Sequence, residues 1–75
     1  MTEISILIAK GKSLMEDGKF SESLAFFEQA LLLNPNDPDL WNFKAISLRG
    51  LGRYEEALDC FNKSLEIDPR DRHAS

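Results

Sequence analysis

The sequence PDLWNFKAISLRGLGRYEEALDCFNKSLEIDPRD, residues 38–71, contains the pattern from which the rest of the chain can be understood. It aligns without a gap on residues 4–37, and we call the offset between the two ranges the repeat length. Chance would give about two or three identical pairs over such a length, fewer than the ten observed, so the identities indicate a tandem repeat. The ten identical pairs are Lys10/Lys44, Ser13/Ser47, Leu14/Leu48, Gly18/Gly52, Glu22/Glu56, Leu24/Leu58, Phe27/Phe61, Leu31/Leu65, Pro35/Pro69 and Asp37/Asp71.

Within each repeat, apolar residues recur with the spacing of an amphipathic helix. We expect four helices, at residues 3–16, 21–33, 38–49 and 54–67. Ser21 is a candidate N-cap for the second, and Asp37 followed by Pro38 is a strong start signal for the third. Leu33 and Leu58 fall in the apolar stripes of their helices, so we expect both on buried faces. The fold class predicted is all-α, with two stacked antiparallel helical hairpins.

A helix–turn–helix unit of this length and punctuation resembles the tetratricopeptide repeat. The second repeat carries the family's residues best, and Lys44 and Leu48 are its departures, where the family has Leu and Tyr. The resemblance implies one domain over residues 1–75, with repeats at 4–37 and 38–71, a tail at 72–75 and a right-handed superhelical path. The matching residues of the second repeat are Trp41, Ala45 for the family's Gly, Ala57, Phe61 and Pro69.

Composition limits the function classes. The net charge is −4, which argues against a phosphate-backbone binder and therefore against nucleic acid as a partner. No apolar run approaches the roughly 20 residues that span a bilayer, so we expect no membrane insertion. The single cysteine, Cys60, cannot form an intramolecular disulfide, and no signal peptide is recognisable. The cytoplasm is the expected location.

Catalysis is not indicated. His73 is the only histidine and lies near the end of the chain, and Cys60 has Asp59 beside it rather than a cluster of cations. No Gly-rich phosphate loop and no Cys/His ligand set occurs. We expect no catalytic residues, no metal and no cofactor, and therefore no enzyme.

The resemblance implies protein–protein interaction, with the first helix of each hairpin lining a concave surface. Helical phase selects six residues on that side for binding a peptide segment of a partner protein. The alternative is that these are ordinary half-exposed side chains or contacts between copies. The six residues are Ile8, Lys12, Met15, Asn42, Ile46 and Arg49.

Some family members hold the C-terminal carboxylate of chaperones with Lys and Asn residues on these helices. Here Ile8 and Lys12 stand at the first pair and Phe43 stands where the third-helix Asn would be. Chaperone-tail binding is therefore not carried over to this chain.

A second hypothesis concerns assembly. A terminal repeat exposes an apolar face that the next repeat or a capping helix would cover, and no capping helix follows residue 71. We expect Leu58 and Leu65 to form a self-association face, giving a homo-oligomer or an exchange of hairpins between copies. The alternative is that the chain is part of a longer array.

Overall fold

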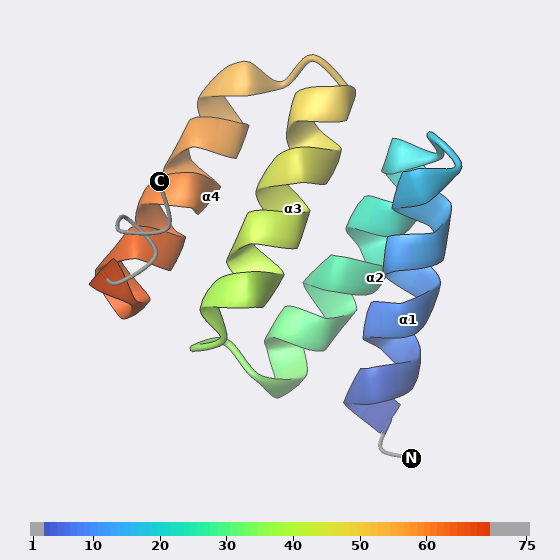
Figure 1. Cartoon of the computed structure of the whole chain (residues 1–75), viewed down its shortest axis with the longest axis horizontal. Helices are drawn as coiled ribbons and strands as arrows, with labels where there is room; N and C mark the ends of the chain where they lie inside the picture. Colours follow the sequence, from blue (N-terminus) through green and yellow to red (C-terminus); the bar gives the residue numbers. More distant parts are fainter. Residues whose placement is uncertain (1–2, 70–75) are drawn as a thin grey trace.

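The computed structural model describes residues 3–69, which form four helices in two antiparallel pairs. They are α1 (Glu3–Glu16), α2 (Phe20–Leu33), α3 (Pro38–Gly50) and α4 (Tyr54–Ile67). Helix α1 packs on α2, α3 packs on α4, and α2 packs on α3, so the two hairpins stack in chain order (Figure 1). The all-α, two-hairpin prediction is confirmed. The tail at 72–75 and His73 lie outside the described residues.

The two hairpin turns are closed in the same way, at equivalent positions of the two repeats. Gly18 has φ 79° and Gly52 has φ 80°, the left-handed conformation that glycine adopts at low cost. In the first turn Lys19 N donates to Leu14 O at 2.9 Å, and in the second Arg53 N donates to Leu48 O at 2.9 Å. Such a bond satisfies a carbonyl that the helix end would otherwise leave unpaired. The repeat seen in the sequence is therefore also a repeat of backbone hydrogen bonds.

The helix starts differ in how they are capped. Asp37 Oδ1 accepts from Asp39 N at 3.0 Å, with Pro38 as the first residue of α3, so the predicted cap is confirmed. Ser21 is not a cap. Helix α2 starts at Phe20, before Ser21, with Lys19 in the cap position. Lys19 follows the glycine turn directly, and its carbonyl oxygen accepts the first helical hydrogen bond, from Ser23 N at 3.0 Å.

The core lies between the hairpins and within each of them. One cluster joins α2 to the second hairpin through residues that include Leu24 and Leu48, and the other is centred on Phe27 and Leu40, both 0% exposed. The expectation that Leu33 and Leu58 are buried is wrong: they are 54% and 59% exposed. Both lie at the edge of their apolar stripe, on the side that no helix of residues 3–69 covers.

Small residues let the helices approach. A Cβ built on Gly11 of α1 would lie 2.6 Å from Phe27 Cε1 of α2, so the ring occupies the space that a side chain would need. The same relation recurs in the second hairpin, where Ala45 is 0% exposed at the equivalent position. This close approach is the reason that a helix-destabilising glycine is tolerated in the middle of α1.

A buried hydroxyl pair joins the two hairpins. Ser23 Oγ of α2 lies 2.9 Å from Ser47 Oγ of α3, and both residues are 0% exposed. Ser23 Oγ also donates to Phe20 O at 2.9 Å. Because a serine hydroxyl has a single proton, Ser47 must be the donor in the pair.

We expect the two alanine substitutions at this pair to differ. Ser23→Ala removes the acceptor of the buried Ser47 hydroxyl and is expected to lower the free energy of unfolding by about 1–2 kcal/mol. Ser47→Ala leaves Ser23 bonded to Phe20 O and is expected to cost less than about 1 kcal/mol. Urea denaturation of both variants checks this, and equal losses, or a larger loss for Ser47→Ala, would contradict the assigned direction.

Candidate functional site

The six residues selected from the sequence lie in two rows on neighbouring helices. Ile8, Lys12 and Met15 are on α1, spaced by four and three positions, which places them on one side of the helix. The second row is Asn42, Ile46 and Arg49 on α3, with the same spacing. Because α1 and α3 contact each other directly, the rows belong to one surface, which we call the α1–α3 surface.

A cation of the first hairpin rests on an aromatic ring of the second. Lys12 Nζ lies 5.4 Å from the centroid of the Phe43 ring on α3. That ring is itself stacked on Phe27, with centroids 5.3 Å apart and planes 20° from parallel. Cation–π contacts of this length contribute about 0.5–1 kcal/mol at exposed sites. The ammonium is therefore held above an apolar ring that the core fixes in place.

Arg49 has a similar arrangement further along the surface. Its guanidinium carbon lies 5.9 Å from the centroid of the Phe61 ring on α4. Both cations are exposed while the rings under them are half-buried. Sequence reasoning missed this role for Phe43, which was considered only as a departure from a family clamp, and for Phe61, which was counted only as core. Neither contact has a signal in the spacing, because each joins helices whose relative position comes from packing.

The apolar residues among the six are more buried than the sequence indicated. Ile8 and Met15 are half-buried and pack against the cluster centred on Phe27. Asn42 and Ile46 are also half-buried. The α1–α3 surface is therefore half-buried and mainly apolar, with two exposed cations on it.

The outer face of α4, on the side away from α3, carries the predicted self-association residues. Leu58 is 59% exposed and Leu65 is half-buried, and Tyr54, one turn before Leu58, is 68% exposed. Residues four apart on a helix share a face, so the exposed ring and the exposed leucine are neighbours.

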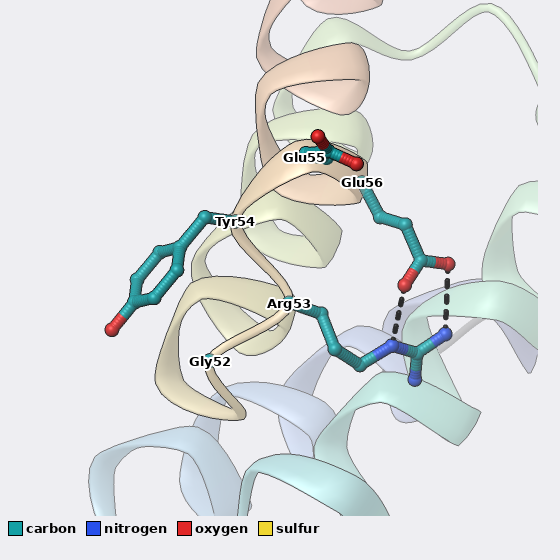
Figure 2. A pocket seen from close by; sticks show the side chains of 5 residues that line it. All are labelled: Gly52, Arg53, Tyr54, Glu55 and Glu56. Carbon is teal, nitrogen blue, oxygen red and sulfur yellow. Dashed lines mark hydrogen bonds and ion pairs between the residues drawn. The ribbon is translucent and has the colours of Figure 1, made fainter.

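An ion pair marks the start of α4. Arg53 Nε donates to Glu56 Oε2 at 2.6 Å and Nη2 donates to Oε1 at 2.8 Å, a two-pronged pairing at the rim of a depression of about 290 Å³. Figure 2 shows the two side chains pointing toward each other while the Tyr54 ring points away. The hydrogen bond from Arg53 lowers the pKa of Glu56, so the pair is intact at neutral pH and is lost as the pH falls through that pKa.

The environment of Cys60 and the arrangement of possible metal ligands can be described for residues 3–69. Cys60 is buried, and its burial raises the pKa of the thiol, which keeps it protonated and weakly nucleophilic. Among residues 3–69 no group of three or more His, Cys, Asp or Glu side chains is placed to hold a metal ion. Within the same residues no helix is long and apolar enough to cross a membrane.

Comparisons with known proteins agree with the geometry. A family model described as tetratricopeptide repeat matches residues 8–72. An uncharacterized protein of Methanocaldococcus jannaschii is 41% identical over 64 residues, covering 85% of this chain and 74% of the relative.

Two further relatives are receptors. The peroxisomal targeting signal receptor of Saccharomyces cerevisiae is 38% identical over 50 residues, which is 67% of this chain and 8% of the receptor. The corresponding receptor of Candida glabrata is 31% identical over 64 residues, which is 85% of this chain and 11% of the receptor. The chain thus spans about a tenth of the length of these receptors. A family match over nearly the whole chain, together with two stacked helical hairpins of equal length, shows that the chain belongs to the tetratricopeptide repeat family.

Proposed function

We propose that this protein–protein interaction domain binds a peptide segment of a partner protein on the α1–α3 surface. The observation that carries the proposal is the contact of Lys12 with the Phe43 ring, which brings a cation of one hairpin and an aromatic residue of the other into a single surface. The relatives named as targeting signal receptors support it, since a targeting signal is a segment of another protein.

The chemistry of the surface defines the ligand class. The half-buried Ile8 and Ile46 offer an apolar floor, and Lys12 and Arg49 stand above it without a carboxylate of the chain within ion-pair distance among those described. A matching segment carries one or two apolar side chains and a carboxylate, which the cations would receive. We assign the chain no reaction and expect it in the cytoplasm, as its composition indicates.

The test uses an array of short peptides that combine apolar residues with an acidic side chain or a free C-terminal carboxylate. Lys12→Glu with Arg49→Glu is expected to weaken binding of the selected peptides about tenfold or more, because two attractive charges become repulsive. Lys19→Glu with Lys63→Glu changes the net charge by the same amount away from this surface and is expected to leave the affinity nearly unchanged. Affinity is measured by fluorescence anisotropy.

Two results would contradict the proposal. Equal weakening by both pairs of substitutions would show only a long-range charge effect. Failure of every peptide to bind with a dissociation constant below about 1 mM, equivalent to roughly −4 kcal/mol, would show that the surface holds no such segment.

A second candidate function is self-association through the outer face of α4. It is favoured by the exposure of Leu58, since an apolar side chain of this size that is 59% exposed and flanked by an exposed tyrosine forms a patch available to another molecule. This candidate uses a different part of the surface and does not exclude the first.

A further inference from the structure

The interface between the two hairpins has two sides, and an uncovered equivalent of each side lies on the described chain, one on the first hairpin and one on α4. We propose that copies of this chain associate head to tail, the outer face of α4 in one copy docking into the depression between α1 and α2 in the next. The inference rests on self-association, the second candidate function, and adds which surface receives α4 and how the copies are oriented.

The internal interface supplies the template. Helix α2 presents Leu24 to the second hairpin, in one core cluster with Leu48 and Cys60. Glu28 Oε2 of α2 lies 3.6 Å from Lys44 Nζ of α3, beside the buried hydroxyl pair of the two helices. The receiving side is thus built from α3 and α4, and the inserted side is α2.

The receiving side has an equivalent surface on the first hairpin. A depression of about 370 Å³ there is lined by five residues of α1 and α2. Each stands one repeat length before a residue of the second hairpin that contributes to or borders the internal receiving side, and four of the five are of the same residue type. The pairs are Lys10/Lys44, Ser13/Ser47, Leu14/Leu48, Glu22/Glu56 and Phe26/Cys60.

The exposure of these residues shows that the equivalent surface on the first hairpin is uncovered. Ser47 is 0% exposed and Leu48 is 2% exposed, whereas Ser13 is exposed and Leu14 is half-buried. Ile6 is 41% exposed although its counterpart, Leu40, is fully buried. The same side chains that α2 covers in the second hairpin are therefore accessible in the first.

The inserted side also has an equivalent face, on α4. Leu58 and Leu65 of α4 stand one repeat length after Leu24 and Leu31 of α2 and are of the same type. Leu24 is 7% exposed in its packed position and Leu58 is 59% exposed in its unpacked one. An exposed helix face and an exposed depression that repeat the two sides of an existing interface fit each other, which selects a second copy of the chain as the occupant.

Two substitutions make the contact between copies weaker than the internal one. Ala57 stands where α2 has Ser23, which removes the partner for the hydroxyl of Ser13. Asn62 stands where α2 has Glu28, so the Lys10 ammonium would face an uncharged amide in place of a carboxylate. Because the two faces are different, the contact does not close on itself and extends with concentration.

The experiment uses the whole chain and two variants that each block one face. Leu58→Lys blocks the inserted face, and Ser13→Lys, at an exposed position, blocks the depression without disturbing the core. Sedimentation equilibrium of the wild-type chain up to about 1 mM, where a contact of roughly −4 kcal/mol is still populated, is expected to show a mass that keeps rising beyond the dimer. Each variant alone is expected to stay monomeric, and their equimolar mixture to form a dimer and nothing larger.

Three results would overturn the proposal. A wild-type chain that stays monomeric up to about 1 mM would show that something other than a second copy covers these faces. Loss of association only in Leu58→Lys would indicate a symmetric α4–α4 contact. A mixture that fails to dimerise although the wild type associates would exclude the head-to-tail arrangement. Leu32→Lys, on a leucine that is 84% exposed and outside both faces, is the control and is expected to associate as the wild type does.

A gain of association gives an independent check. Asn62→Glu restores the counterpart of the Glu28–Lys44 pair and is expected to tighten association about two- to fivefold at low salt, the range for an exposed ion pair. Glu56→Gln leaves both faces in place and is expected not to change it. Lys12→Glu with Arg49→Glu, on the α1–α3 surface, is expected to keep the assembly, so that loss of peptide binding and loss of association are measured separately.

Discussion

Phe27→Ala is expected to remove a large share of the folding free energy of this chain. The ring is 0% exposed, fills the space left by Gly11 and stacks on Phe43, so its removal leaves a cavity at the junction of three helices. Loss of a buried Phe side chain costs about 3–5 kcal/mol. A domain of this size has a free energy of unfolding of only about 4–11 kcal/mol, so the variant is at or near the limit of folding.

The measurement is urea denaturation followed by far-UV circular dichroism. Phe26→Ala is the matched control, because it removes the same side chain from the next position, where the residue is only half-buried and borders the open depression. We expect a clearly smaller loss than at Phe27, since part of the Phe26 ring stays in contact with water and its removal leaves no enclosed cavity. Similar losses at the two positions would show that Phe27 is not the centre of the core.

Gly11→Val is expected to lower the free energy of unfolding by about 3 kcal/mol, at the upper end for an overpacked core. Its Cβ would lie 2.6 Å from Phe27 Cε1, and Phe27 cannot move without disturbing its stacking on Phe43. The modest gain in helix propensity of Val over Gly does not offset a clash of this size.

Gly50→Val tests whether the neighbour can yield. A Cβ at Gly50 would come within 2.5 Å of the Phe20 ring, but Phe20 is the first residue of α2 and only half-buried, so its ring can turn toward solvent. We expect a smaller loss than at Gly11, measured in the same denaturation series. A larger loss at Gly50 would contradict the view that mobility of the opposing ring decides the cost.

The site was predicted only in outline. The helical spacing of Ile8, Lys12 and Met15 was enough to place them on one side of α1, and the repeat placed the second row on α3. The spacing gave no information on Phe43 or Phe61 as rings under the cations, because each contact joins two helices and depends on how those helices pack: α1 on α3 for Phe43, and α3 on α4 for Phe61. The binding role of this surface stays a prediction until the peptide array is measured.

The sequence by itself determined the repeat length, the fold class and the four helices to within one residue at each end, because periodicity, Gly18, Gly52 and the Asp37–Pro38 start are local signals. Only the tertiary structure decided which members of the apolar stripes are covered. Leu24 and Leu58 occupy equivalent positions of one repeat, yet one is 7% and the other 59% exposed. The physical reason is that burial depends on the neighbour: α3 covers the face of Leu24, and no helix of the described chain covers that of Leu58.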